Sequence, residues 1–271
     1  RSVVHCRLRD LDDDHENAAF VLDPLPDQFG VEQLHDRLTF LTNDAATRRH
    51  AAETVSHLQV LGCSSYVATF APDTDLAERV LWPTSPIEFH GMEDARFVEI
   101  VDGSAPRYCA TYTAFDGTFI AQNLLTTDDF ASFEITPMAG AAARGKGLAL
   151  FPRQIDGRYV ALSRADRETN SVAFSDELLC WDESTVIQTS GRPWDLVQLG
   201  NCGSPIETAE GWLVLTHGVG PVRTYSIGAI LLDLDDPTKV IATGDEPLLR
   251  PLPEARDGYV PNVVYTCGAL A

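Results

Sequence analysis

Residues 108–115, with the sequence YCATYTAF, set a pattern that the chain repeats. Residues 159–166, YVALSRAD, and residues 212–219, WLVLTHGV, follow the same scheme. Each segment opens with an aromatic residue after a turn or a short polar loop, and its alternation predicts a half-buried strand. Residues 66–70, YVATF, form a weaker copy upstream. The stronger copies recur at intervals of about fifty residues, which is a blade-sized period.

A second motif recurs in phase with the first. Residues 127–133, TDDFASF, correspond to residues 175–181, SDELLCW. A period of about fifty residues in a β-rich chain is typical of propeller blades with about four strands each. A β-sandwich with chance similarity is the alternative, but two motifs in phase favour the propeller. We expect four blade-like units, with residues 259–269 as a candidate start of a fifth.

The N-terminal part has a different pattern. Val31, Leu34, Leu38 and Leu41 follow helical spacing, and a second helix is expected to end at Gly62. Residues 3–8 are compatible with a strand. We therefore expect a partly helical N-terminal extension over residues 1–62 and a mostly β domain, which carries the site, over residues 63–271.

The charge balance limits the classes of partner. The 271 residues include 40 acidic and 20 basic ones, and the net charge is −20. Nucleic acid is disfavoured because phosphate backbones are bound by clustered Lys and Arg, and an anionic membrane surface is disfavoured for the same reason. No segment has the length and apolarity of a membrane span, and no signal peptide is evident.

The cysteines and the common catalytic motifs exclude several kinds of site. The six cysteines form no CxxC pair and no zinc-ligand spacing. Cys109 and Cys267 lie in apolar, strand-like runs and are expected to be buried thiols. No HExxH or EF-hand pattern is present, so no metal is predicted, and the absence of GxSxG argues against a Ser-His-Asp hydrolase. We expect a reduced, cytoplasmic protein.

Residues 91–97, GMEDARF, place two adjacent carboxylates, Glu93 and Asp94, with Arg96 at the start of an apolar strand. Adjacent carboxylates repel each other, which raises the pKa of one, while Arg96 can keep the other ionised. Such a pair suits general acid catalysis near neutral pH. The alternative is a surface salt-bridge cluster that precedes a strand.

The repeats also predict where polar side chains meet. Equivalent strands of propeller blades direct the same ends toward a central channel, so Asp116, Arg164 and His217 should approach one funnel. His217 ends a strand, and Arg223 and Tyr225 lie at the start of the next. A strand-end histidine with a nearby arginine and tyrosine can bind an anion or a sugar hydroxyl. A single histidine is otherwise more often a structural residue.

Two glycine-containing segments are candidate ligand loops. Arg144 and Lys146 stand among glycines before an apolar run, an arrangement that suits an oxyanion such as phosphate, although a solvated loop is the alternative. Residues 200–207, GNCGSPIE, contain Ser204 and Glu207 in a tight turn that can bring backbone close to a ligand. A connection between blades is the alternative for this turn.

Taken together, the motifs resemble glycoside hydrolase family 130, the inverting β-mannoside phosphorylases and related β-mannosidases. They occur in the order of the family and cover roughly residues 64–269. The matching stretches are residues 91–96, 112–115, 146–152, 203–208, 211–212, 217–219, 225–229, 232–237 and 260–264.

The resemblance implies a five-bladed propeller with a central active site and no cofactor. It implies that Asp94 is the general acid, which protonates the glycosidic oxygen through the 3-hydroxyl of the mannosyl group. Phosphate then attacks from the opposite face and gives α-mannose 1-phosphate. The family motifs that bind phosphate fall on Arg144, Lys146 and His217. The expected substrate contacts are Glu93, Arg96, Asp116, Arg164, Ser204, Glu207 and Tyr225.

Three functions stay open at this stage. The first is phosphorolysis of a manno-oligosaccharide or another β-mannoside, with phosphate as co-substrate and a homo-oligomer as one assembly. The second is hydrolysis by the same acid, with Glu93 or Glu207 as the base, and an inverting hydrolase needs its two carboxyl groups about 6.5–9.5 Å apart. The third is a carbohydrate-binding propeller without catalysis, or a truncated domain.

Overall fold

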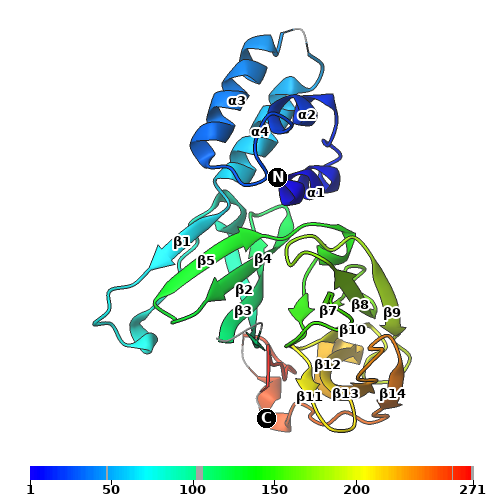
Figure 1. The fold of residues 1–271 in the computed structure, drawn as a ribbon. Coiled ribbons are helices and arrows are strands. Elements are labelled where there is room, and N and C mark those ends of the chain that lie inside the picture. The colour runs from blue at the N-terminus through cyan, green and yellow to red at the C-terminus, as the bar shows by residue number, and fades with distance from the viewer. Residues whose placement is uncertain (47, 102–105, 258, 270–271) are drawn as a thin grey trace.

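The computed structural model describes residues 1–46, 48–101, 106–257 and 259–269. Helices occupy the N-terminal part of this chain and antiparallel sheets occupy the rest (Figure 1). The α-helices are α1 (Ser2–Asp10), α2 (Glu16–Leu22), α3 (Val31–Asp44) and α4 (Ala51–Gly62). The prediction of a mostly β chain with helices at its N-terminus is confirmed, but residues 3–8 are helical and the strand considered there is wrong.

The helices have an apolar core of their own. Leu34, Leu38 and Leu41 of α3 are buried against α2 and α4, as their spacing predicts. Asp13, buried in the turn after α1, accepts hydrogen bonds from Thr54 Oγ1 at 2.8 Å and from His57 at 2.7 Å. These bonds hold the turn between α1 and α2 against α4.

Three sheets follow, each built from strands that pair in chain order. The first contains β2 (Gly91–Val101), β3 (Pro106–Phe115), β4 (Ile120–Thr127) and β5 (Ser132–Pro137), with β1 (Tyr66–Thr69) added beside β5. The second contains β6 (Ala149–Leu150), β7 (Tyr159–Ser163), β8 (Asn170–Ser175) and β9 (Ser184–Gln188). The third contains β10 (Gln198–Asn201), β12 (Trp212–Gly220), β13 (Thr224–Leu232) and β14 (Val240–Thr243), with β11 (Ile206–Glu207) beside β12.

The two sequence repeats occupy equivalent places in these sheets. Tyr108, Tyr159 and Trp212 each lie on the second strand of their sheet, on β3, β7 and β12, as the repeat predicts. Thr127 and Ser175 each end the third strand, and each hydroxyl accepts a backbone N–H of the turn that follows, at 2.8 Å and 3.1 Å. The repeat therefore reflects one supersecondary unit used more than once.

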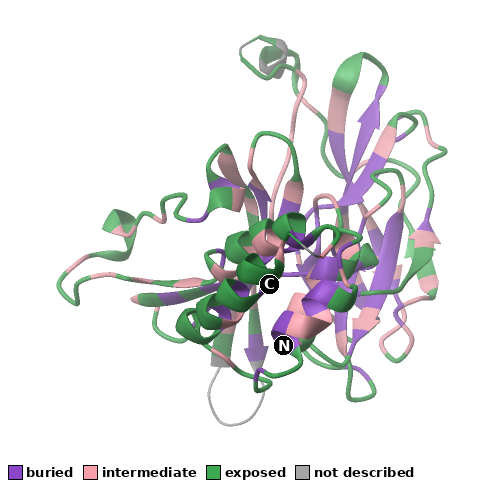
Figure 2. Ribbon diagram, turned by 90° about the horizontal axis from the view of Figure 1, so that it is seen from above, coloured by how far each residue is buried: buried purple, intermediate pink, exposed green. Residues whose placement is uncertain are grey.

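Neighbouring sheets share their apolar cores. One core joins Cys109 and Leu124 of the first sheet to Leu150 and Ala161 of the second. Another joins Val172 of the second sheet to residues of the third that include Trp212 and Val214. Figure 2 shows the buried segments running through the sheets, whereas turns and outer helix faces are exposed. Residues 259–269 form an isolated bridge from Val263 to Tyr225 and no strand, so the start of a further sheet is not found there.

The cysteines depart from the expectation of a fully reduced chain. Cys6 of α1 and Cys180 after β8 form a disulfide across 174 residues of sequence. Cys109 is buried as predicted, and burial raises the pKa of its thiol to about 11. Cys267 is half-buried rather than buried. Among the described residues, no helix combines the length and apolarity needed to cross a membrane.

A buried carboxylate fixes the segment that leads into β2. Glu88 ends the 3-10 helix η2 (Pro86–Glu88), and no part of it is exposed. It accepts hydrogen bonds from the Tyr66 hydroxyl at 3.1 Å, from Asn123 Nδ2 at 3.1 Å and from the Ser85 amide at 3.0 Å, and also from the Tyr112 hydroxyl. Because β1, β3 and β4 all contribute donors, Glu88 connects three strands to the chain just ahead of the GMEDARF stretch.

We predict that Glu88→Ala lowers the free energy of unfolding by about 3 kcal/mol or more, because several buried donors lose their acceptor at once. Urea denaturation measures the change. Glu134→Ala, at an exposed carboxylate on β5, is the control and should shift stability by less than about 0.5 kcal/mol. Equal shifts in the two variants would contradict a structural role for Glu88.

Candidate active site

A cavity of about 630 Å³ opens where the ends of several strands meet. Glu93 and Asp94 reach it from β2, His217 from β12 and Tyr225 from β13. Loops that flank the second sheet add the cations, with Lys146 ahead of β6 and Arg164 directly after β7. Residues from all three sheets thus converge on one site.

A bulge in β2 lets two consecutive carboxylates face the same cavity. Neighbouring side chains of a regular strand point to opposite faces of the sheet. The pairing of β2 with β3 shifts between Glu93 and Arg96, and Asp94 has a φ of 57°, in the left-handed region. Bulges re-aim side chains beside functional sites, and Asp accepts this conformation more readily than most residues. The backbone therefore turns Asp94 toward the cavity beside Glu93.

Two hydrogen-bond donors hold the carboxylate of Asp94. Its Oδ2 atom lies 3.4 Å from Nη2 of Arg96 and accepts a hydrogen bond from the Tyr265 hydroxyl at 3.2 Å. Arg96 is fully buried, and its other donors bind the carbonyls of Asp94 and Cys202, each at 2.8 Å. Burial raises the pKa of Tyr265, so its phenol keeps its proton at neutral pH. The Asp94 side chain is 33% exposed and stays open to a ligand.

The basic side chains of the cavity contact other polar groups. Lys146 pairs with Glu93, and Nη1 of Arg164 lies 3.2 Å from Nε2 of His217. Two glycines make room for this packing. A Cβ at Gly147 would stand 2.6 Å from Cδ of Arg164, and a Cβ at Gly200 would stand 2.6 Å from Cε1 of His217. No larger residue fits at either position without moving the Arg164–His217 pair.

Burial sets the protonation state of His217. It lowers the pKa of His217 to about 3, with further contributions from the Arg164 and Arg96 guanidinium groups. The imidazole is therefore neutral at physiological pH, with one nitrogen as donor and the other as acceptor. Arg164 is 8% exposed, and its Nε has no hydrogen-bond partner among the described residues.

Several residues predicted for the site lie elsewhere. Arg144 pairs with Asp10 of α1 at 3.2 Å, and Glu207 pairs with Arg153 at 2.7 Å. Asp116 caps its own turn by accepting the amides of residues 118 and 119, each at 2.7 Å. None of these, nor Ser204, lines the cavity. The cavity therefore brings together Lys146, Arg164 and His217 but not Arg144 or Asp116.

Other cavity residues were not singled out from the sequence. Tyr265, Gln198 and Arg167 line the cavity, and Arg223 joins them from the turn between β12 and β13. Arg223 is the exception, because the sequence already placed it with His217 and Tyr225 as a candidate contact for an anion or a sugar hydroxyl, and all three line the cavity. Tyr265 reaches Asp94 across 171 residues of chain, a contact that no local pattern predicts.

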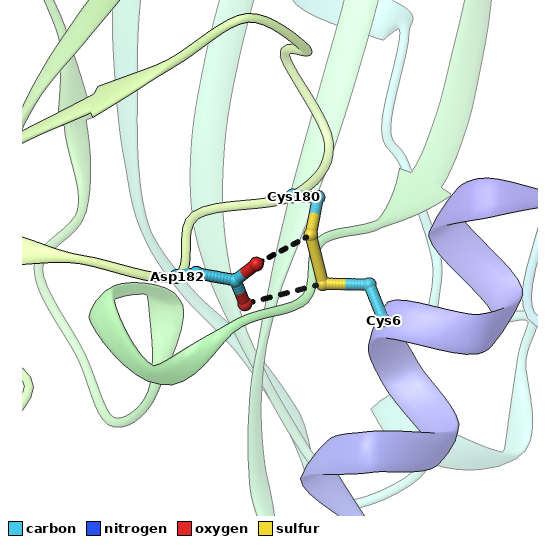
Figure 3. Close-up of side chains that lie close together, drawn as sticks. All are labelled: Cys6, Cys180 and Asp182. Carbon is cyan, nitrogen blue, oxygen red and sulfur yellow. Dashed lines mark hydrogen bonds between the residues drawn. A yellow bond between two sulfur atoms is a disulfide. The ribbon is translucent and has the colours of Figure 1, made fainter. Parts of the chain in front are cut away.

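One cluster in the described residues has the spacing of a metal site, and it lies outside the cavity. It consists of Cys6, Cys180 and Asp182 (Figure 3). The Asp182 carboxylate oxygens lie 3.8 Å from the two sulfurs, but the cysteines are joined in a disulfide, which removes the thiolates that a metal would need.

Comparison with known proteins agrees with this geometry. The profile of glycoside hydrolase family 130, described as β-1,4-mannooligosaccharide phosphorylase, matches residues 72–271. A 1,2-β-oligomannan phosphorylase of Thermoanaerobacter sp. is 37% identical over 186 residues, which cover 67% of this chain and 61% of that protein. A β-1,2-mannobiose phosphorylase of Listeria innocua is 32% identical over 197 residues, which cover 70% of this chain and 54% of that protein.

A solved structure shows the same likeness. The Listeria innocua β-1,2-mannobiose phosphorylase, in complex with β-1,2-mannobiose, superposes with a TM-score of 0.62 at 31% identity. The match covers 70% of this chain and 55% of that one. The chain thus spans little more than half the length of the relatives that it matches, and the four α-helices precede the residues matched by the family profile.

We predict that His217 makes stability fall as pH falls from about 6.5 toward about 3, because the unfolded state then binds a proton that the folded state excludes. The contribution is fully present above pH 6.5. His217→Asn should therefore show a shallower loss of melting temperature between pH 7 and pH 4.5. His35→Asn, at an exposed position on α3, is the control. Parallel pH profiles for wild type and His217→Asn would contradict the buried, neutral state.

Proposed function

Since the chain belongs to glycoside hydrolase family 130, we propose that the protein is a β-mannoside phosphorylase that releases α-mannose 1-phosphate with inversion. One observation carries this proposal. A single cavity holds an accessible carboxylate, Asp94, together with three basic side chains, Lys146, Arg164 and His217. The first side chain suits acid catalysis on a glycosidic bond, and the others suit an anionic nucleophile.

The proposed fold is a five-bladed propeller. Three successive sheets of strands in chain order, each sharing a core with the next, support it. The second-strand positions of Tyr108, Tyr159 and Trp212 support it as well. In such a fold the inner strand ends surround one axis, which accounts for a cavity that draws residues from every sheet.

Asp94 is the proposed general acid. In the productive state its carboxyl group is protonated, and the proton passes by way of the mannosyl 3-hydroxyl to the glycosidic oxygen. A phosphate oxygen attacks the anomeric carbon from the opposite face, the bond from that carbon to the leaving sugar breaks, and the configuration inverts. Arg96 and Tyr265 orient the carboxyl group by binding Oδ2, which leaves Oδ1 for the substrate.

Phosphate binding needs local positive charge because the whole chain carries a net charge of −20. Arg164 offers a guanidinium that lines the cavity, and Lys146 offers a point charge that its pairing with Glu93 keeps there. His217 takes part as a neutral hydrogen-bond donor rather than as a cation, because burial lowers its pKa to about 3. Tyr225 stacks beside the imidazole, with the ring centroids 6.1 Å apart.

The contacts favour phosphorolysis over hydrolysis. Glu207, one candidate base, is paired with Arg153 and does not line the cavity. Glu93, the other candidate, is adjacent to the acid and bound to Lys146. No other carboxylate lines the cavity in the described part of the chain. The proposed partners are a β-mannoside and phosphate, and a cytoplasmic location and a homo-oligomeric assembly stay predictions.

Product analysis tests the proposal. Relatives act on β-1,2-mannosides and the family description names a β-1,4-mannooligosaccharide, so both linkages belong in the panel. The full-length protein is incubated with each mannobiose with and without phosphate. We expect mannose 1-phosphate only when phosphate is present. Free mannose in both conditions would establish a hydrolase, and no product in either would favour a binding protein.

We predict that Asp94→Asn lowers turnover by about 10²–10⁴-fold, because the amide cannot deliver a proton. Steady-state rates of phosphorolysis measure the loss, and circular dichroism checks the fold. Asp128→Asn is the control, since Asp128 is a carboxylate paired with Arg107 at the protein surface. Near-normal turnover in Asp94→Asn would remove this residue as the acid.

We predict that Lys146→Ala raises the KM for phosphate by about tenfold or more and changes the KM for the mannoside far less, because a charge-assisted contact to one substrate is lost. The control is Lys239→Ala, at a lysine paired with Asp236 at 3.1 Å and outside the cavity. An equal rise in both KM values would show that Lys146 supports the whole site instead of binding phosphate.

A further inference from the structure

We propose that Asp10 of the N-terminal helical part is a positioning residue for the phosphate loop, defined here as residues 140–147. The proposal rests on the proposed function, because Lys146 of this loop is assigned to phosphate. Asp10 does not line the cavity. It acts on a loop whose far end reaches the cavity.

Asp10 binds the start of the loop with both carboxylate oxygens. Oδ2 accepts a hydrogen bond from the Gly140 amide at 2.8 Å, and Oδ1 accepts one from Nη2 of Arg144 at 3.2 Å. Its side chain is only 9% exposed, so water competes weakly for these bonds. Arg7 of the same helix adds a second cation at 3.8 Å. The carboxylate therefore joins a backbone donor and a side chain four residues apart within one loop.

The loop is also held at its other end. Gln122 Nε2 donates to the Gly145 carbonyl at 2.7 Å, and Asn201 Nδ2 donates to the Gly147 carbonyl at 2.8 Å. Lys146 lies between these two carbonyls and after the Arg144–Asp10 ion pair. Its side chain can reach Glu93 and the cavity only while both ends of the loop keep their places. At the start of the loop Asp10 supplies bonds to Gly140 and Arg144, and at its end the first and third sheets supply the bonds from Gln122 and Asn201.

Helix α1 is itself attached firmly enough to act as a support. The Cys6–Cys180 disulfide binds it covalently to the segment after β8 (Figure 3). Two further contacts reach the same segment, from Arg9 to Asp182 at 3.2 Å and from the Ser2 hydroxyl to Glu177 at 2.9 Å. Because a disulfide restricts how far its two chains can separate, Asp10 stays within reach of the loop.

The segment that carries Cys180 also pairs directly with the start of the loop. The Trp181 amide donates to the Ala139 carbonyl, and the Ala142 amide donates to the Trp181 carbonyl, each at 2.8 Å. Gly140 has a φ of 100°, and a Cβ there would lie 2.3 Å from the Trp181 carbonyl oxygen. Only glycine fits this close approach. The helix, the segment and the loop thus form one connected support.

Arg144 acquires a role that differs from the one its sequence suggests. The family motif places it among the phosphate ligands, but its guanidinium pairs with Asp10 instead of facing the cavity. The geometry makes it the part of the loop that Asp10 holds. A positioning pair and a phosphate ligand respond differently to mutation, so the two roles can be separated.

Phosphate binding is the first readout. Titration calorimetry with inorganic phosphate on the full-length protein should give a Kd about three- to tenfold weaker for Asp10→Asn, which keeps an acceptor for Gly140 but loses the charge that holds Arg144. The KM for the mannoside should not change. Arg144→Gln should weaken phosphate binding as much as Asp10→Asn does, and the double variant should be no weaker than either single one. Additive losses, or a far larger loss in Arg144→Gln, would show direct binding by Arg144 and overturn the inference.

Hydrogen exchange of residues 140–147 is the second readout, and it needs no ligand. Exchange in this loop should become faster in Asp10→Asn. Asp36→Asn is the matched control, because it makes the same change at an exposed carboxylate on α3. If wild-type protein binds no phosphate but Asp10→Asn still loosens the loop, the proposed function fails and the positioning role stands. Unchanged exchange and unchanged phosphate affinity in Asp10→Asn would overturn the inference.

Discussion

The site depends on the hydrogen bonds that the buried guanidinium of Arg96 donates. A charge without exposure to water must have its donors satisfied, or the fold does not tolerate it. Arg96 meets this requirement by binding the backbone of Asp94, the backbone of Cys202 and the hydroxyl of Tyr265. These partners come from three distant segments of chain. The guanidinium whose donors are satisfied in this way also orients the Asp94 carboxylate.

Small residues make this convergence sterically possible. Gly147 and Gly200 leave space for Arg164 and His217, and a Cβ at Gly203 would lie 2.5 Å from the Cys267 carbonyl. The same segment carries Tyr265, so the close approach at Gly203 helps bring the phenol to Asp94. The close approach of these segments buries polar groups at the site, and a neutral His217 is one consequence of that burial.

The net negative charge of the chain is compatible with a cavity that carries local positive charge. A net charge of −20 repels phosphate at long range, and this repulsion is screened within about 8 Å at physiological salt. Selective binding must then come from short-range contacts with groups that point into the cavity. Lys146 and Arg164 supply such contacts, whereas the exposed Arg153 and Arg158 pair with surface carboxylates.

The sequence by itself determined the repeated strands, the helices α3 and α4 and the candidate role of the GMEDARF stretch, but not the helices α1 and α2. Two local signals carried these predictions. Apolar and polar residues alternate after Tyr108, Tyr159 and Trp212, and apolar residues from Leu34 to Leu41 recur at helical spacing. Such signals are local because a strand or helix that buries one face places apolar residues at short, regular intervals. Only the tertiary structure decided which polar residues meet. Arg144 and Lys146 lie two residues apart and carry the same charge, yet one binds Asp10 and the other lines the cavity. The left-handed bulge at Asp94, the Tyr265 contact and the Cys6–Cys180 disulfide likewise depend on segments far apart in sequence, and no local pattern encodes where such segments come together.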